Sequence, residues 1–217
     1  MYNLVEYLFN EYFFNKKGKI RMRKEQKEKR NEEIINTALE LFSKYGYADT
    51  KVTDIAKAVN MSTGLLFHYY ESKEKLYFTL LERGIEEINN KMKNLIKEPI
   101  DYFRCVLDTV FSNIQENFQS AQIYVLIKRA ANSETTPKEI KKYILDNFRR
   151  IFDINITKLI LGQSKGQIKK GNPEAMVKLF WDCIDGIVSS YIMDTSRPLP
   201  EPEWIIDMLK NHSLASD

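Results

Sequence analysis

The sequence predicts an all-α protein of about nine helices, and three observations support this fold class. Apolar residues recur at intervals of three and four, as they do on one face of a helix. The alternation of period two that a half-buried strand requires is nowhere sustained. All six prolines lie beyond residue 98, and Pro99, Pro137 and Pro173 stand where helical patterns begin. The 217 residues are enough for one domain or two small ones.

Composition excludes several classes of protein. With 43% hydrophobic and 29% charged residues the chain is not disordered. A net charge of +3 is too small for a histone-like protein that binds nucleic acid through a uniformly basic surface. The two cysteines, Cys105 and Cys183, exclude a disulfide framework and favour a reducing cytosol. The richest apolar stretch, residues 183–193, is too short to span a bilayer. We therefore expect a cytoplasmic protein with no membrane partner.

Residues 1–21 form an N-terminal extension with two alternative interpretations. The segment from Met1 to Phe14 is apolar and aromatic, but no basic region precedes it and no small-residue cleavage site follows. In one interpretation Met22 is the natural initiator, because Lys16-Lys-Gly-Lys19 can be encoded by a purine-rich, ribosome-binding-site-like stretch. In the other, the segment is a short amphipathic helix packed on its neighbours. A basic run from Arg21 to Arg30 follows, which can track a phosphate backbone or a minor groove, or simply be a charged helix start.

The next elements are three helices with a sharp break between the second and the third. A stripe formed by Ile34, Ala38, Leu41, Phe42 and Tyr45 predicts a helix that ends near Gly46. Residues 52–59 and 63–70 predict two short helices, separated by Asn60-Met-Ser62. Two short helices joined by a three-residue turn are the helix-turn-helix geometry, whose second helix enters the major groove of DNA.

The remaining helices are marked by apolar stripes and by caps. Residues 103–114 and 144–152 carry stripes, and residues 123–127 read more naturally as helix than as strand because Lys-Arg-Ala-Ala follows. Thr136-Pro-Lys-Glu139 predicts a capping box with proline at the first helical position, and Asn172-Pro173 repeats the cap. A last helix is expected from about Glu203 to Asn211, after Pro198, Pro200 and Pro202.

Motifs of catalysis are missing from the sequence. His68 and His212 have no metal-ligand spacing to a cysteine or carboxylate cluster. No nucleophile elbow, dinucleotide fingerprint or phosphate loop is present, and the glycine-dotted segment 162–171 reads as a helix end and loop. We expect no enzyme activity, no cofactor and no metal.

The helix-turn-helix segment has the parts its geometry needs. Ala56 is small enough for a close helix crossing, Ser62 can cap the second helix, and Leu66 and Tyr70 can pack inward. That leaves four outward residues: Thr63, Leu65, Phe67 and His68. Gly64 in the first turn lets the backbone approach another backbone or a phosphate.

Several short motifs in order resemble the tetracycline-repressor (TetR) family of bacterial transcription regulators. They are Ile34-Ile-Asn-Thr-Ala-Leu-Glu-Leu-Phe42, Gly46-Tyr47, Thr53-Asp-Ile-Ala56, Ser62-Thr-Gly-Leu-Leu-Phe-His-Tyr-Tyr70 and Ser72-Lys-Glu-Lys-Leu76. The family usually has tyrosine at the position of Phe67 and phenylalanine at that of Tyr70. The missing hydroxyl at Phe67 removes a phosphate hydrogen bond that the family commonly makes.

The resemblance implies roles for the outward residues. Thr63 and Leu65 fall at base-reading positions, where leucine can touch a thymine methyl group. Lys51, Thr53, His68 and Lys73 fall at or near positions that hold phosphates. The whole predicted DNA surface is Lys51, Thr53, Ser62, Thr63, Gly64, Leu65, Phe67, His68 and Lys73. The alternative interpretations are that His68 lines the core and that the lysines are merely solvated.

The C-terminal part is predicted to bind an effector and a second subunit. Residues 161–186 look like the family's penultimate connection and helix, which pairs with the last helix in a four-helix bundle. The residues assigned to this dimer interface are Phe180, Ile184, Ile187, Val188 and Tyr191. An apolar effector pocket is assigned to Phe103, Leu107, Phe111, Tyr124, Ile127, Phe148, Phe152 and Trp181, each of which could equally be plain core.

The resemblance thus implies a homodimeric repressor that an unknown small molecule releases from a palindromic operator. The expected organisation is an extension (1–21), a three-helix DNA-binding domain (22–78) and a larger helical effector-binding and dimerisation domain (79–213). Two rival functions remain open. One is a helical carrier or enzyme with a vestigial helix-turn-helix, and the other is a protein that uses the motif to bind another protein.

Overall fold

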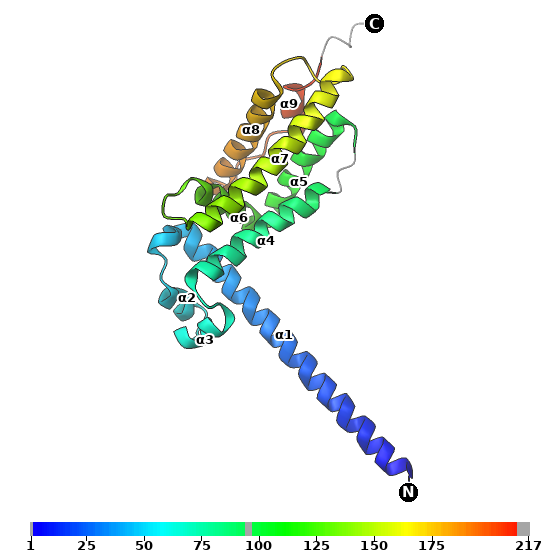
Figure 1. Cartoon of the computed structure of the whole chain (residues 1–217), viewed down its shortest axis with the longest axis vertical. Coiled ribbons are helices and arrows are strands. Elements are labelled where there is room, and N and C mark those ends of the chain that lie inside the picture. The colour runs from blue at the N-terminus through cyan, green and yellow to red at the C-terminus, as the bar shows by residue number, and fades with distance from the viewer. Residues whose placement is uncertain (1, 94–96, 212–217) are drawn as a thin grey trace.

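The structure is a computed structural model that describes residues 2–93 and 97–211, with only the backbone helix described for residues 2–20. Over these residues it contains nine helices and no strand, so the predicted all-α class is confirmed (Figure 1). The helices are α1 (Tyr2–Asp49), α2 (Val52–Ala58), α3 (Thr63–Tyr69), α4 (Lys73–Lys93), α5 (Pro99–Glu116), α6 (Phe118–Asn132), α7 (Lys138–Ser164), α8 (Pro173–Met193) and α9 (Pro202–Asp207).

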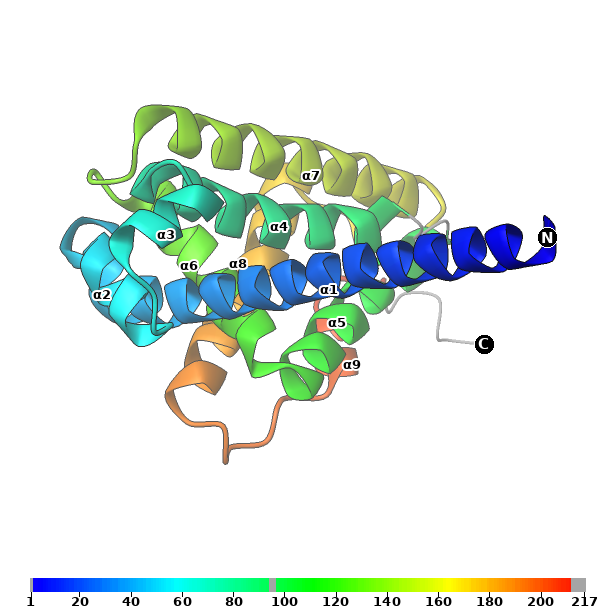
Figure 2. The ribbon, with the colours of Figure 1, turned by 90° about the horizontal axis from the view of Figure 1, so that it is seen from below.

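Helix α1 is long, and its first half leaves the body of the molecule. Figure 1 shows the N-terminal half of α1 projecting as a straight helix beyond the other elements, and in Figure 2 its N-terminal end extends past them. This segment is therefore helical, but it does not pack on neighbouring helices. The side chains of residues 21–29 are all exposed. The regular helix ends at Gly46, as predicted, because Gly46 adopts a positive φ of 80° that favours glycine.

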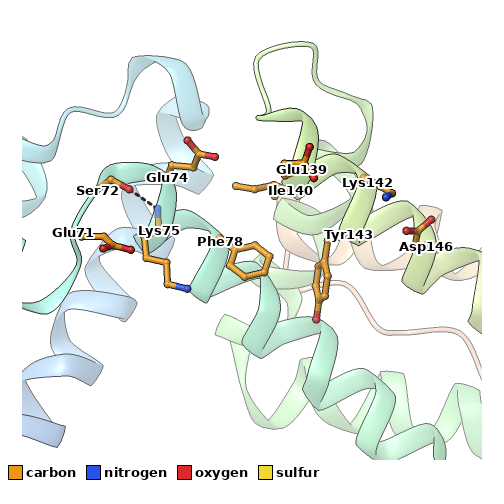
Figure 3. Close-up of a pocket in the computed structure, with 10 residues that line it drawn as sticks. All are labelled: Glu71, Ser72, Glu74, Lys75, Phe78, Glu139, Ile140, Lys142, Tyr143 and Asp146. Atoms are coloured by element: carbon orange, nitrogen blue, oxygen red, sulfur yellow. Dashed lines mark hydrogen bonds between the residues drawn. The ribbon is translucent and has the colours of Figure 1, made fainter.

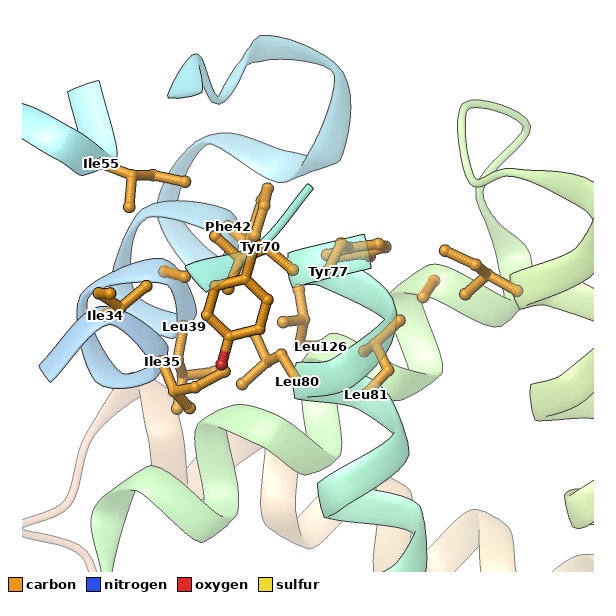
Figure 4. Close-up of a cluster of buried hydrophobic side chains, with 14 of the residues drawn as sticks. Ile34, Ile35, Leu39, Phe42, Ile55, Tyr70, Tyr77, Leu80, Leu81 and Leu126 are labelled. Atoms are coloured by element: carbon orange, nitrogen blue, oxygen red, sulfur yellow. The ribbon is translucent and has the colours of Figure 1, made fainter. Parts of the chain in front are cut away.

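The first hydrophobic cluster joins the helix-turn-helix to the rest of the bundle (Figure 4). Ile34 and Phe42 of α1 pack with Ile55 of α2, and the Phe42 ring meets the edge of Tyr77 at 4.7 Å between centroids. The cluster continues into α6 through Leu126. Helix α4 contributes to this core and then runs on to Lys93, so it belongs both to the packing of the first three helices and to the rest of the bundle.

The second cluster is formed by the carboxyl-terminal helices. It includes Tyr102, Phe103, Val106, Leu107, Leu159, Phe180, Ile184, Val188, Ile205 and Ile206. Helix α5 packs against α6, α7 and the short α9, and α8 packs against α6 and α7. The segment 123–127 is part of α6, so its assignment to a helix is correct.

Two predicted helix ends differ in the structure. Helix α7 begins at Lys138 with Pro137 as its N-cap and no capping side chain, so the predicted capping box at Thr136 is wrong. Helix α9 ends at Asp207 rather than near Asn211 because the chain then turns back onto the α7–α8 loop. There the Lys169 amide donates to the Leu209 carbonyl at 2.9 Å. The cap at Asn172 is correct, since its side chain accepts from the Ala175 amide at 3.1 Å.

Candidate DNA-binding and effector sites

The turn between α2 and α3 is closed by main-chain hydrogen bonds. Asn60 adopts a positive φ of 52°, a conformation that asparagine tolerates better than most residues. The Met61 amide then donates to the Ala56 carbonyl at 2.8 Å, which ends α2. Ala56 is 2% exposed, as expected for a small residue at a helix crossing. The turn therefore fixes the angle at which α3 leaves α2.

Helix α3 is capped and divided into two faces, as the sequence predicts. The Ser62 hydroxyl accepts a hydrogen bond from the Leu65 amide at 3.1 Å. Leu66 and Tyr70 are buried, and the Tyr70 hydroxyl donates to the Asn31 side chain at 2.7 Å. On the other face Leu65 and Phe67 are 45% and 44% exposed, although both are large and apolar. An exposed apolar pair on a rigid helix is typical of a contact surface.

The other predicted DNA contacts lie near this face. Lys51 and Thr53 are exposed at the start of α2, and Thr63 is half-buried at the start of α3. Gly64 is exposed, and a Cβ added there meets no atom within 4 Å. His68 is exposed, so the alternative that it lines the core is wrong.

Lys73 differs from the expectation of a free phosphate contact. Its ammonium donates to the main-chain carbonyls of Tyr47, Ala48 and Thr50, at 2.8, 3.3 and 3.1 Å. These carbonyls belong to residues 47–50, which follow the break at Gly46 and lead toward α2; we call this segment the turn between α1 and α2. An ammonium has three protons to donate, and all three are directed at this turn. The side chain therefore points inward. Ser72 caps α4 as predicted, accepting from the Lys75 amide at 3.0 Å (Figure 3).

Two neighbouring cavities lie among the helices of the carboxyl-terminal layer. The inner slot, of about 60 Å³, is lined mainly by apolar residues that include Val106, Ile123 and Tyr124. The side pocket, of about 200 Å³, lies between α7 and α8 and is lined by Phe148, Phe152 and Lys128 among others. Trp181 and Ile88 line both. Together they are a concave, largely apolar site of the kind that holds small molecules.

Half of the predicted effector residues line these cavities and half do not. Tyr124, Phe148, Phe152 and Trp181 are lining residues. Phe103, Leu107, Phe111 and Ile127 are no more than 5% exposed and belong to the packed cores, so their assignment to the pocket is wrong. The reason is that helical spacing marks the apolar face of a helix but does not tell which part of that face meets a void.

A polar group in the pocket wall was not predicted. The Tyr124 hydroxyl donates to the Asp185 carboxylate, which also pairs with the Lys128 ammonium at 2.6 Å. Burial, together with the Asp185 carboxylate, raises the pKa of Tyr124 well above its usual value, so the phenol stays protonated. A signal was available in the sequence, because Asp185 lies directly after Ile184 in the most apolar part of α8.

A third and larger hollow lies closer to the helix-turn-helix. This groove, of about 560 Å³, runs between the first turns of α4 and α7 (Figure 3). The Phe78 and Tyr143 rings meet edge-to-face, 5.2 Å apart between centroids, and the surrounding side chains are mostly charged. None of its lining residues was among those predicted for the effector.

The predicted dimer residues are placed differently from the expectation. Phe180, Ile184 and Val188 are no more than 2% exposed and face the chain's own core, so they are not available to a second subunit. Ile187 and Tyr191 are half-buried. The opposite face of α8 exposes Leu179 (48%), Gly186 and Met193 (87%), each seven residues after the last, and α7 exposes Ile160 (49%). We call these four residues the outer stripe.

The described parts of the chain carry neither a membrane span nor a metal cluster. Among residues 2–93 and 97–211 no helix is long and apolar enough to cross a bilayer. In the same ranges no group of three or more His, Cys, Asp or Glu side chains could hold a metal ion. His212 lies outside the described residues.

Comparisons with known proteins match the helix-turn-helix region to a family of transcription regulators. The family model described as bacterial regulatory proteins, tetR family, matches residues 34–80. The fatty acid metabolism regulator protein of Bacillus subtilis (strain 168) is 25% identical over 176 residues, which cover 79% of this chain and 88% of the relative.

Two solved structures show the same fold. The ketosteroid transcriptional regulator KstR2 of Mycobacterium tuberculosis has a TM-score of 0.70 at 19% identity, covering 83% of this chain and 95% of that one. AibR in complex with isovaleryl coenzyme A and operator DNA has a TM-score of 0.66 at 19% identity, covering 82% and 94%.

Proposed function

The chain belongs to the tetR family of bacterial transcriptional regulators, and from this premise we propose that it is a homodimeric repressor which a small molecule releases from a palindromic operator. A dimer seated in the major groove of a promoter blocks RNA polymerase, which makes repression the simplest output. Operators are usually palindromic because the two identical recognition helices of a dimer contact two identical half-sites.

The single observation that carries the DNA-binding function is the outward pair on α3. Leu65 and Phe67 stand 45% and 44% exposed on a helix that Ser62 caps and Leu66 anchors. A monomer gains nothing from holding two apolar side chains in water on a rigid helix. In a major groove Leu65 can contact a thymine methyl group, and Thr63 can donate or accept a hydrogen bond at a base edge.

The proposed phosphate contacts surround this pair. Lys51, Thr53 and His68 are exposed near α3, and the main-chain amides at the start of α3 can face a phosphate beside Gly64. These contacts set register and affinity without reading sequence. We add the basic segment 21–30 of α1, which is exposed over residues 21–29 and lies toward the end of the helix that projects from the bundle (Figure 1).

The effector site is proposed for the inner slot and the side pocket. Their apolar walls fit a hydrocarbon group, and the Lys128–Asp185 pair offers polar contacts at one wall of the side pocket. The relative from Bacillus subtilis is named for fatty acid metabolism, and AibR was solved with isovaleryl coenzyme A. We therefore propose an acyl compound, with its chain in the slot and its polar end near Lys128.

Helix α6 is the proposed route from this site to DNA. Lys128 lines the side pocket, and the guanidinium of the next residue, Arg129, donates to the Ser43 carbonyl of α1 at 2.8 Å. A ligand that shifts α6 therefore shifts the base of the helix-turn-helix. Because the coupling free energy is shared, operator DNA must weaken effector binding by the same factor.

Dimerisation is proposed through the outer stripe rather than the buried face of α8. Residues seven apart form a straight seam along a helix, and Gly186 at its centre allows a partner helix to approach closely. We further propose that the protein is cytoplasmic, is not an enzyme, and divides functionally near residue 78. That boundary falls inside α4, the helix that both parts share.

The deciding experiment is fluorescence anisotropy of the protein on the duplex upstream of its own gene, against a scrambled duplex, across a salt series. We expect tight, sequence-preferring and salt-sensitive binding. Leu65→Ala should relax discrimination at one or two base pairs while much of the non-specific binding remains. Unchanged discrimination at every position would remove Leu65 as a reader.

The same assay separates the rival functions. Equal binding to both duplexes means that the operator lies elsewhere. No binding to either duplex at low salt contradicts the proposal and favours a carrier, an enzyme or a protein-binding role. Once an operator is known, straight-chain and branched acyl-coenzyme A compounds are tested for release of the protein.

A further inference from the structure

The side chain of Lys73 joins the start of α4 to the end of α1 and to the turn that leads into α2. Lys73 is the first residue of α4, and its ammonium reaches back across more than twenty residues of chain to the turn between α1 and α2. All three carbonyls that it contacts lie within residues 47–50, at 2.8 to 3.3 Å. These three hydrogen-bond acceptors are all main-chain carbonyl oxygens.

The surroundings hold this ammonium firmly. It lies 4.4 Å from the centroid of the Tyr47 ring, a cation–π contact, and the Tyr47 ring in turn packs 4.7 Å from Tyr77 of α4. A positive charge in the first turn of a helix is opposed by the dipole of that same helix. The three carbonyls and the ring offset this unfavourable position, which marks the residue as serving the tertiary structure.

We propose that Lys73 is a positioning residue, which fastens α4 to the α1–α2 turn so that a movement of α4 carries the start of α2 with it. The turn itself is stiff, because the buried Thr50 hydroxyl donates to the Gly46 carbonyl at 2.7 Å. It leads directly into Lys51 and Thr53. The effector signal thus re-aims the phosphate-facing end of α2 together with α3, and this inference rests on the proposed DNA-binding function.

A fastening lysine and a phosphate-binding lysine differ in a measurable way. A lysine that neutralises a phosphate on binding releases a counterion, so its loss lowers the slope of log affinity against log salt by about 0.9. A lysine that stays on main-chain carbonyls releases none. Its loss weakens binding by loosening α2, with the slope nearly unchanged.

The first measurement is amide hydrogen exchange on the full chain without DNA. The amides of Asp54 and Ile55 both donate to the Lys51 carbonyl, at 3.1 and 3.3 Å, and report on the start of α2. In Lys73→Met we expect these amides to exchange about tenfold faster or more, since charge-assisted hydrogen bonds are lost nearby. Lys75→Met is the matched control, because the Lys75 ammonium lies over the Phe78 ring and not on the turn. In Lys75→Met the amides of Asp54 and Ile55 should exchange as they do in the wild type.

The second measurement is the salt slope of operator binding. Lys73→Met should bind the operator about tenfold more weakly with a slope within about 0.3 of the wild type, whereas Lys51→Met should lower the slope by about 0.9. A slope that falls by about 0.9 in Lys73→Met, with exchange at the start of α2 unchanged, would overturn the proposal and make Lys73 a phosphate contact.

A milder variant keeps the proposal testable if Lys73→Met does not fold. The flat guanidinium of Lys73→Arg cannot face three carbonyls as an ammonium does, so exchange at Asp54 and Ile55 should rise while the salt slope stays constant. Wild-type exchange in Lys73→Arg contradicts the fastening role. Hydrogen exchange is measured without DNA and therefore tests the fastening role of Lys73 by itself. A wild-type protein that binds no duplex would contradict the proposed DNA-binding function, but the exchange result would still decide the role of Lys73.

Discussion

Some residues of α3 are not required by the packing of the free protein, which indicates a role in binding. Gly64 has no steric role in the free protein, because a Cβ there meets no atom within 4 Å. A glycine that the fold does not need, in the first turn of a helix expected to touch DNA, points to a close approach by the nucleic acid.

Gly64→Ala should therefore separate stability from binding. The free energy of unfolding should stay constant or rise by up to about 1 kcal/mol, since alanine favours a helix over glycine. Operator affinity should fall, because the added methyl group meets the DNA. Urea unfolding and anisotropy on the same preparation measure both quantities. An affinity equal to that of the wild type would show that no part of the DNA approaches this turn.

The sequence could predict which residues of α3 face outward but not what Lys73 contacts. The first depends on local periodicity, which places Leu66 inside and Leu65 outside. The second depends on carbonyls that lie 23 to 26 residues earlier in the chain. No local pattern encodes that distance, and the family resemblance pointed to a phosphate instead.

At the scale of elements, close helix contacts depend on a few small residues. Gly162 near the end of α7 is buried, and a Cβ there would lie 2.5 Å from Ile168 Cδ1 and 3.0 Å from Pro99 Cβ. This one glycine lets α7, the start of α5 and the α7–α8 loop pack together.

Gly162→Ala should lower the free energy of unfolding by about 1–3 kcal/mol, the usual effect of overpacking, despite the better helix propensity of alanine. Ile168→Val removes the Cδ1 atom that the new methyl group meets. The double variant should therefore recover part of the loss in a double-mutant cycle measured by urea unfolding. Strictly additive single effects would mean that Ile168 is not the obstacle.

Local chemistry predicted the start of α8 but not the end of α9. Asn172 and Pro173 mark the start of α8 through local chemistry, and the structure follows them. The end of α9 is set by pairing with the α7–α8 loop, where the Asn211 amide donates to the Gln167 carbonyl at 3.1 Å. That contact joins residues more than forty positions apart, so the predicted continuation to Asn211 had no local signal against it.

At the scale of the whole molecule, the partners of each face of α8 also depend on contacts that are distant in the sequence. Its sequence predicts a helix that is apolar on more than one side, but periodicity alone did not tell the core face from the outer one. The structure assigns Phe180, Ile184 and Val188 to the core and leaves the outer stripe exposed.

Leu179→Glu should therefore convert a dimer into a monomer, because it places a charge on the outer stripe that the partner helix is proposed to cover. Phe118→Glu is the control, since Phe118 is similarly exposed at 42% but lies at the start of α6. Sedimentation equilibrium of both variants gives their masses. A dimeric Leu179→Glu protein would place the interface elsewhere.

We expect buried tyrosines to lower the stability of the protein at alkaline pH. Burial raises the pKa of Tyr77 and of Tyr102 to about 12 in the folded protein, from an ordinary value of 10.0. Their contribution to stability is complete below pH 10 and is lost as the pH rises through 12, because the unfolded chain ionises first.

Each of the two tyrosines should lower the free energy of unfolding by about 1.4 kcal/mol at pH 11. Urea unfolding at pH 9, 10 and 11 measures the decline. The double variant Tyr77→Phe and Tyr102→Phe should decline less steeply over this range than the wild type. Parallel curves for the two proteins would show that these phenols do not govern the decline.

The projecting part of α1 changes how the molecule moves through water. Residues 2–30 form a helix about 40 Å long, more than twice the radius of gyration of about 17 Å that a compact chain of 217 residues has. Such a shape raises hydrodynamic friction without adding mass. We therefore expect a monomer to elute earlier from a calibrated gel-filtration column than a compact protein of the same mass, so that elution volume alone would overstate the number of subunits.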